Sequence, residues 1–328
     1  MKCKVSVIVP VYNAAKYLDE MVNSLLAQTL KEIEFIFVND CSTDNSLEIL
    51  YEFEKKDTDR IIIINLDENQ GPGGARNVGL QYSSGEYIAF ADSDDYVNSK
   101  MYECMYEKAI EDDFDLVECG YFTERRNKEM MLWDKSMEGE VSFDNRVRMF
   151  MSCGFIVTKL YKRSIIIDSQ IQFIHKIQFE DVDFLSRVYC KVQKVGIVDR
   201  PFYYYRDNPE SFSNKGNKSK YFDIINTFCT EYLEHMRKEK GYNILKPVIE
   251  FVILGIWFDM FKAYVTKSPK IDINSLQKID KEIKKYVSNY GENIFFVERA
   301  KHDLFKDAFL INSFDSQKAV VILENVKI

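Results

Sequence analysis

The sequence predicts an α/β protein with a mostly parallel central sheet and an α-helical C-terminal extension. Short runs of β-type residues alternate with stretches of helical periodicity over the first half of the chain, which is typical of parallel strands joined by right-handed crossovers. Acidic residues directly follow two of these runs. After residue 216 the patterns are mostly helical, with few turn signals. We therefore expect two units, residues 1–215 and residues 216–328.

The first unit opens with four expected strands that are separated by three expected helices. Asn13 is expected to cap the first helix, because the apolar residues after it recur at helical spacing. The third strand is almost wholly apolar, as in a strand covered on both faces. In such sheets ligands bind beyond the carboxyl ends of the strands, so a site is expected near Asp40 and Asp92. The expected strands are 4–10, 34–40, 60–65 and 86–92, and the helices lie within 13–26, 42–56 and 69–85.

A less regular α+β pattern begins near residue 98. In the C-terminal extension, the apolar segment 248–265 is interrupted by Glu250, Asp259 and Lys262, so it predicts a buried or half-buried helix and not a membrane span. The other expected elements are helices at 101–110 and 179–192, strands at 115–122 and 194–199, and an aromatic loop at 200–214.

The composition excludes several classes of protein. With 328 residues, 46% of them hydrophobic, the chain can bury a sizeable core. A net charge of −8 argues against nucleic acid as a partner, although a cation can still bring a small phosphorylated ligand to an acidic site. The seven cysteines are scattered and include no C-x-x-C pair, which favours reduced thiols in a cytoplasmic protein over disulfides or a zinc site.

The stretch YIAFADSDDY, residues 87–96, holds three acids within four residues. Residues i and i+2 of an extended chain point to the same side, so Asp92 and Asp94 can converge while Ser93 faces away. Two such carboxylates are typical ligands of Mg²⁺ or Mn²⁺ bound together with a substrate diphosphate. The alternative is a solvated acidic turn that caps a helix starting near Ser99.

Other ligand-binding motifs fit poorly. An EF-hand loop starting at Asp92 would need glycine where Val97 stands. A Rossmann site would need G-x-G-x-x-G after the first strand, where PVYNAA stands, and the sequence holds no Walker A motif. A sugar-phosphate nucleotidyltransferase would be expected to carry a Gly-rich, Lys-containing loop at that place, and that loop is missing.

Four stretches together resemble the family 2 inverting glycosyltransferases of the GT-A fold. They are VSVIVPVYNAAKYLDEMVNSLLAQTLKEIEFIFVNDCSTDNS, NQGPGGARNVGL, GEYIAFADSDD and FEDVDF. The resemblance covers roughly residues 4–215, and its strength is the order of the motifs, since each alone is weakly specific. It implies a hexosyltransferase-type, metal-dependent enzyme of the kind that builds bacterial surface polysaccharides.

The resemblance also implies a donor site for a nucleotide-sugar, with UDP favoured. It places Tyr12 against the base, Asp40 on uracil N3–H, and Arg76 on the nucleotide side of the pocket. The alternatives are core packing for Tyr12, helix capping for Asp40 and a surface salt bridge for Arg76. The donor-binding residues that it implies are Pro10, Val11, Tyr12, Asn13, Asp40, Gly73, Arg76, Asp92, Ser93 and Asp94.

Two glycines and three acids complete this implied site. Gly73 and Gly74 are expected to let the backbone come close to the donor. In the D-x-D motif, Asp92 is implied to lie near the ribose and the metal, and Asp94 to be the direct ligand of Mn²⁺ or Mg²⁺. Asp95 is expected to cap a helix or to support the other two acids.

The catalytic residues implied by the resemblance are Glu180 and Asp181 in FEDVDF, with Asp181 as the base. The alternative is that both acids cap their helix. Lys159 and Tyr161 are implied to face the acceptor. Other candidates are Arg206 and Ser211 in a loop that either closes over the diphosphate or is an ordered surface loop, and His175 as a third metal ligand or a surface residue.

The expected partners are a UDP-sugar and a glycan or lipid-linked glycan acceptor. The helices of 216–328 are expected to contact a partner copy, to lie peripherally on the inner face of the membrane, or to close over the acceptor. A catalytically silent nucleotide-sugar-binding or scaffold protein remains the main alternative from another class, and the intact acidic pairs argue against it.

Overall fold

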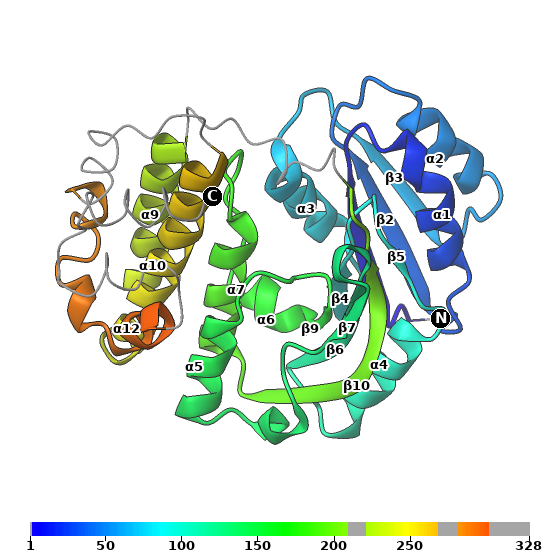
Figure 1. The fold of residues 1–328 in the computed structure, drawn as a ribbon. Helices are drawn as coiled ribbons and strands as arrows, with labels where there is room; N and C mark the ends of the chain where they lie inside the picture. Colours follow the sequence, from blue (N-terminus) through cyan, green and yellow to red (C-terminus); the bar gives the residue numbers. More distant parts are fainter. Residues whose placement is uncertain (1, 209–220, 268–280, 302–328) are drawn as a thin grey trace. The chain divides into compact units, whose positions relative to one another are not determined.

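The computed structural model describes residues 2–208, 221–267 and 281–301 (Figure 1). Clustering of residue contacts divides the chain into two compact units, Met1–Lys215 and Gly216–Ile328. The first unit is a mixed α/β fold built on one large sheet, and the described part of the second unit is helical.

One half of the sheet is parallel, with the strand order β3-β2-β1-β4. Its strands are β1 (Val5–Val11), β2 (Ile33–Asn39), β3 (Ile61–Asn65) and β4 (Tyr87–Phe90). The expectation that the third strand is covered on both faces is wrong. β3 is the edge strand, and only Ile61 of its residues is buried. Its isoleucines therefore reflect β propensity more than burial.

Three helices follow the parallel strands in turn: α1 (Ala15–Leu26), α2 (Ser46–Glu54) and α3 (Gly71–Tyr82). Figure 1 shows α1 and α2 on one face of the sheet and α3 on the other. Asn13 does not cap α1: it has a positive φ of 50°, and its side-chain oxygen accepts a hydrogen bond from the Thr43 amide at 2.7 Å. Asp44 serves the start of α1 instead, because its carboxylate accepts from the Ala15 amide at 3.0 Å.

The other half of the sheet is mixed. β9 (Lys159–Lys162) lies antiparallel between β4 and β6 (Leu116–Thr123), and β6 pairs in parallel with β10 (Lys194–Tyr205). The short strands β5 (Tyr96–Val97), β7 (Lys128–Met130) and β8 (Gly139–Glu140) pair antiparallel along its margin. The helices of this half are α4 (Met101–Glu111), α5 (Phe143–Met151), α6 (Arg163–Asp168) and α7 (Glu180–Lys191).

β10 is longer than the sequence predicts. The aromatic stretch expected as a loop continues the strand to Tyr205, with irregular register around Pro201. Phe202 and Tyr203 are buried, so their packing against the core favours a strand over a loop. As a result, β10 delivers Arg206 to the same edge of the sheet at which β4 ends.

The second unit contains α9 (Tyr221–Lys238), α10 (Tyr242–Lys267), a 3₁₀ turn at Tyr290–Glu292 and α12 (Ile294–Lys301). Residues buried from 248 to 258 include Trp257 and Phe258, in agreement with the buried helix expected there. Among the described residues, no helix has the length and apolarity that crossing a membrane requires.

Candidate active site

Arg76, on α3, joins two acids that lie far apart in the sequence. Its Nη2 contacts Asp92 Oδ1 at 2.8 Å, and its Nη1 contacts Glu180 Oε1 at 2.8 Å. We call these three residues the Arg76 bridge. The Arg76 side chain is only 7% exposed, so it is not a surface ion pair. Burial lowers the pKa of Arg76, but the neighbouring Asp92 and Glu180 carboxylates outweigh this and raise it.

The acidic turn at residues 92–95 is held by the end of β10. Asp94 Oδ2 accepts from Asn208 Nδ2 at 2.8 Å, and the Asp94 carbonyl accepts from Arg206 Nε at 2.7 Å. Asp95 is 1% exposed and accepts from the Tyr203 hydroxyl at 2.7 Å and from the Arg206 amide at 2.8 Å.

These contacts contradict the interpretation of the turn as a solvated helix cap. α4 begins at Met101 without a side-chain cap. Asp95 does not cap a helix; its hydrogen bonds to the end of β10 fix the position of the turn. Burial, and then repulsion from Asp92, raise the pKa of Asp94. A ligand with positive charge would therefore reduce the electrostatic repulsion between the two carboxylates.

The donor set of Asp92 and Asp94 fits a hard divalent cation. Each carboxylate has one oxygen engaged, by Arg76 or by Asn208, and the second oxygen has no hydrogen-bond partner among the described residues. Within those residues there is no group of three or more His, Cys, Asp and Glu side chains that could hold a metal. Two protein carboxylates are sufficient where substrate phosphates supply further oxygens, as Mg²⁺ sites commonly arrange.

His175, considered as a third metal ligand, is exposed, and its Nε2 lies 3.1 Å from Asn77 Nδ2. Asn77 also clamps the backbone of Phe173, donating to its carbonyl and accepting from its amide, both at 2.8 Å. We therefore assign His175 to the segment that leads into α7 and not to a metal. No periodicity in the sequence points to this role of Asn77.

Asp181 occupies the first turn of α7, beside the Arg76 bridge. Its Oδ1 accepts from the Val182 amide at 2.9 Å. Burial raises the pKa of Asp181 to about 7; the charge of Glu180 adds to this effect, and Arg76 opposes it. Burial also raises the pKa of Glu180, against the effect of Arg76. A half-buried carboxylate that titrates near neutral pH is suited to accept a proton.

The residues after β1 and β2 differ in what they can offer a ligand. Tyr12 is 52% exposed, so core packing is excluded for it, whereas Val11 is fully buried and presents only its backbone. Asp40 is 2% exposed, and its Oδ1 accepts from the Gln70 amide at the start of α3 at 2.6 Å. Burial raises the pKa of Asp40. Asp40 thus caps α3 and not the helix that directly follows it. Three further residues are implied to bind the nucleotide-sugar. Pro10 and Ser93 are half-buried, and Asn13 is exposed.

At two glycines of α3, the Cβ position is filled by neighbouring protein atoms. A Cβ at Gly73 would lie 2.5 Å from the Ile174 carbonyl oxygen, and one at Gly74 would lie 2.6 Å from Gln70 Cβ and 3.3 Å from His175 Nδ1. The expectation that the backbone at both glycines comes close to the donor stays a prediction. Both glycines let α3 pack against the segment 173–176, which brings Glu180 within reach of Arg76.

The structure also bears on the residues expected near the acceptor and in the loop over the diphosphate. Lys159 and Tyr161 are both fully buried, so neither side chain can face an acceptor. Arg206 lies between the rings of Tyr17 and Tyr96, at 5.3 and 5.2 Å, and pairs with Glu20 at 2.7 Å. Arg206 is therefore held in place by its neighbours, as expected for an ordered segment. Ser211 lies outside the described residues.

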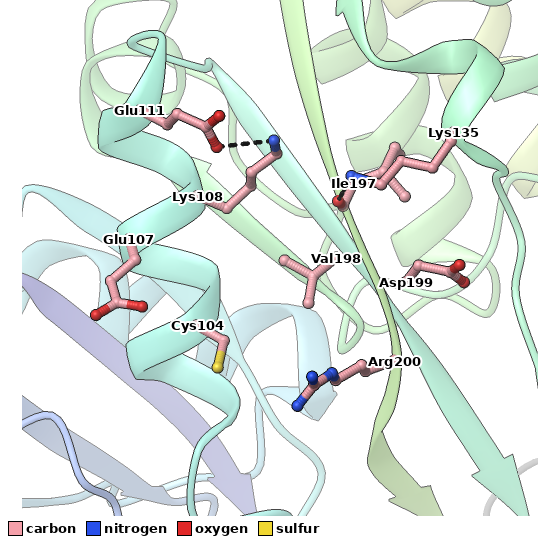
Figure 2. A pocket seen from close by; sticks show the side chains of 9 residues that line it. All are labelled: Cys104, Glu107, Lys108, Glu111, Lys135, Ile197, Val198, Asp199 and Arg200. Carbon is pink, nitrogen blue, oxygen red and sulfur yellow. Dashed lines mark hydrogen bonds and ion pairs between the residues drawn. The ribbon is translucent and has the colours of Figure 1, made fainter.

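A surface cavity of about 410 Å³ lies between α4 and β10 (Figure 2). Figure 2 shows the Lys108–Glu111 ion pair, 2.8 Å long, at its rim. The cavity shares no residue with the Arg76 bridge or the acidic turn. It is a separate feature, and the chemistry described above does not involve it.

Comparison with known proteins gives consistent matches. Residues 6–167 match the model of "Glycosyl transferase family 2". The "Uncharacterized glycosyltransferase EpsJ" of Bacillus subtilis is 33% identical over 220 residues, which are 64% of this chain and 62% of that protein, so the match falls short of two thirds of EpsJ. The "Glycosyltransferase GlyG" of Streptococcus pneumoniae is 31% identical over 62% of this chain and 70% of that protein.

Solved structures share the fold. The structure of residues 1–349 of TarS from Staphylococcus aureus, in complex with UDP-GlcNAc, aligns with a TM-score of 0.71 at 21% identity over 99% of this chain and 91% of that one. The mannosyltransferase PcManGT from Pyrobaculum calidifontis, in complex with GDP-Man and Mn²⁺, aligns with a TM-score of 0.54 at 15% identity over 99% and 88%. The match to TarS shows that this chain has the GT-A fold, with the mixed sheet described above.

Proposed function

Because the chain belongs to glycosyl transferase family 2, we propose that it moves a sugar from a UDP-sugar to a hydroxyl group of a glycan or lipid-linked acceptor, with inversion and with a divalent cation. The glycosyltransferase activity itself follows from the family. The observation that carries the rest is the Arg76 bridge. It ties an acid of the D-x-D turn to the acid beside Asp181, so that donor-side and base-side carboxylates share one cation.

The choice of UDP rests on two supports. TarS, the structural neighbour with the same fold, is described in complexes with UDP-GlcNAc and with UDP. In this chain, Tyr12 offers an exposed ring and follows β1, whose neighbour β2 leads to Asp40. Because Asp40 is buried, a further hydrogen-bond donor such as a uracil N–H would stabilise its ionised form.

Asp92 and Asp94 are the residues that would hold Mg²⁺ or Mn²⁺, which when bound neutralises charge on the departing diphosphate. Arg76 orients Asp92 through the contact from its Nη2 to Asp92 Oδ1. Arg206 and Asn208 hold the main chain and side chain of Asp94 in place. These contacts keep two like-charged carboxylates together.

Asp181 acts as the general base in this proposal. The acceptor oxygen attacks the anomeric carbon from the face opposite UDP; as its bond to carbon forms, the bond to the diphosphate oxygen breaks, and the hydroxyl proton passes to Asp181. The product has the inverted configuration, and UDP leaves with the electron pair of the broken bond. A base with a pKa of about 7 is half ionised at neutral pH and accepts the proton readily.

We also propose that the protein works in the cytoplasm, where reduced thiols persist, because the seven cysteines are scattered along the sequence and include no C-x-x-C pair. The residues named in this chemistry lie in the unit Met1–Lys215, and the second unit is Gly216–Ile328. We assign the second unit to docking, on the inner membrane surface or on a second copy of the chain.

The test is thermal unfolding of wild-type protein and of Asp94→Ala, with UDP or GDP, in Mn²⁺ or in EDTA. Saturating UDP with Mn²⁺ should stabilise the wild type by about 2.7 kcal/mol at a hundredfold excess over Kd, and should leave Asp94→Ala unchanged. Asp59→Ala, which removes an exposed acid of the same unit, is the matched control and should behave as wild type. Equal stabilisation of Asp94→Ala, or of wild type in EDTA, contradicts the cation site; stabilisation by GDP alone contradicts the UDP donor.

A further inference from the structure

Three aromatic side chains form a small surface beside the proposed base and the acidic turn. Phe155 stacks on Tyr121 with ring centroids 4.6 Å apart and meets Tyr205 edge-on at 5.9 Å. We call these three residues the aromatic shelf. Tyr121 is 7% exposed, whereas Phe155 is half-buried and Tyr205 is 37% exposed. The shelf therefore keeps open ring surface, which packing alone would tend to cover.

The sheet places this shelf at the edge that carries the active site. β9 runs antiparallel to β4, so the segment before Lys159 lies at the edge where β4 ends and leads to Asp92. Tyr205 is the last residue of β10 and precedes Arg206, whose amide binds Asp95.

The segment that leads to Phe155 contacts α7. Cys153, two residues before Phe155, donates from Sγ to the Val182 carbonyl at 3.5 Å, next to Asp181. Tyr205 thus lies next to the residue that binds the acidic turn, and the segment before Phe155 contacts α7 beside Asp181, near where an acceptor must lie to be deprotonated.

Buried polar groups hold the shelf in place. Lys159 Nζ donates to the Phe155 carbonyl at 2.6 Å and pairs with Glu118 Oε2 at 2.8 Å, and both side chains are fully buried. The Tyr161 hydroxyl donates to the Ile156 carbonyl at 3.0 Å. A buried ion pair contributes little net stability to a fold. Because this pair also binds a loop carbonyl, we infer that it serves to fix the position of the loop.

We propose that the aromatic shelf binds a sugar ring of the acceptor and turns one of its hydroxyl groups toward Asp181. The inference rests on the proposed function and names its acceptor class as a cyclic sugar, not an acyclic polyol. A pyranose ring has an apolar face of C–H groups that matches the face of Phe155 or Tyr205, while its hydroxyl edge is left for the carboxylates. Lys159 and Tyr161 are positioning residues for this surface, since they act on it only through the loop backbone.

The experiment measures acceptor binding by saturation-transfer NMR on the full chain with UDP and Mn²⁺. The probes are the methyl β-glycosides of glucose, galactose and N-acetylglucosamine, with ribitol 5-phosphate as the acyclic comparison. The variants are Phe155→Leu, which removes the flat ring, and Phe155→Tyr, which keeps it. Tyr51→Leu removes an exposed ring on α2 and serves as the matched control.

At least one glycoside should bind the wild type, Phe155→Tyr and Tyr51→Leu alike, and should bind Phe155→Leu about fivefold to tenfold more weakly, with UDP affinity and melting temperature unchanged. The proposal is overturned if Phe155→Leu binds that glycoside as wild type does, if no glycoside binds the UDP-loaded wild type, or if ribitol 5-phosphate binds through Phe155 as tightly. Glycoside binding through Phe155 without any UDP binding supports the shelf and contradicts the UDP donor, so the two proposals fail separately.

Discussion

Each half of the sheet has a buried cationic side chain next to it or within it, and the two side chains differ in the groups that they contact. Arg76, on α3 behind the parallel half, bridges Asp92 and Glu180, each of which is partly exposed, with side chains 34% and 12% accessible. Lys159, within the mixed half, pairs with Glu118 where both are 0% exposed, and its remaining proton donors bind loop oxygens.

One cation therefore contacts acids of the proposed active site, whereas the other supports the structure around that site. Removing charge at Arg76 should change how neighbouring acids bind ligands and protons, because solvent and substrate reach them. Removing charge at Lys159 should first cost stability, because a fully buried carboxylate is left alone. The variants below test this contrast.

Lys159→Met should have the largest effect. It leaves Glu118 buried without its ion partner, and we expect the free energy of unfolding to fall by about 3–5 kcal/mol, measured by chemical denaturation. Combining it with Glu118→Leu removes the stranded charge and should restore most of that stability. The double variant still lacks the donor to the Phe155 carbonyl, so its glycoside binding should stay weakened. A single variant that loses less than about 1 kcal/mol would show that the pair is not a buried one in solution.

Asp181→Asn should have the next largest effect, and on catalysis alone. Transfer to acceptor should fall by at least roughly 10²-fold, while the fold and the affinity for UDP-sugar are kept. Asparagine serves well at a helix start, so an acid that only caps α7 would tolerate this change. Single-turnover transfer rates measure the effect once an acceptor is in hand, and near-normal rates would move the base to Glu180 or elsewhere.

Asp40→Asn should weaken UDP binding by about 1–3 kcal/mol, measured by titration calorimetry, because the amide presents a donor to uracil N3–H. Stability should change little, since the amide oxygen can still accept from the Gln70 amide at the start of α3. If UDP affinity is unchanged, capping of α3 is the whole role of Asp40.

Arg76→Lys should give the smallest change, a shift in the pH profile. Transfer in the wild type should rise with pH through about 7, as Asp181 loses its proton and becomes an active base. Arg76 lowers the pKa of Asp181 and lysine cannot bridge both acids, so in the variant the pKa of Asp181 should rise. The midpoint of the rate–pH curve should therefore move to higher pH. An unchanged or lower midpoint would show that Arg76 does not lower the pKa of Asp181.

The parallel half of the sheet could be predicted from the sequence in some detail. Strand and helix patterns there alternate in chain order, and each pattern has a period that the residues display directly. The acids at residues 92–95 were found for the same reason, since they follow an apolar strand without a break. The mixed half was predicted less well. Lys159 and Tyr161 share one side of a short strand, but whether that side faces core or solvent depends on β4, β6 and the helices around it.

The sequence by itself therefore determined the α/β class, the edge at which the site lies and which acids stand there, because these follow from local periodicity and from the direction of parallel strands. Only the tertiary structure decided which charges meet. Arg76 pairs with Glu180 across 104 residues, and Asp95 is buried under a tyrosine 108 residues away. Such partners are chosen by distance through space and by the cost of leaving a buried charge alone, and neither quantity has a period along the chain.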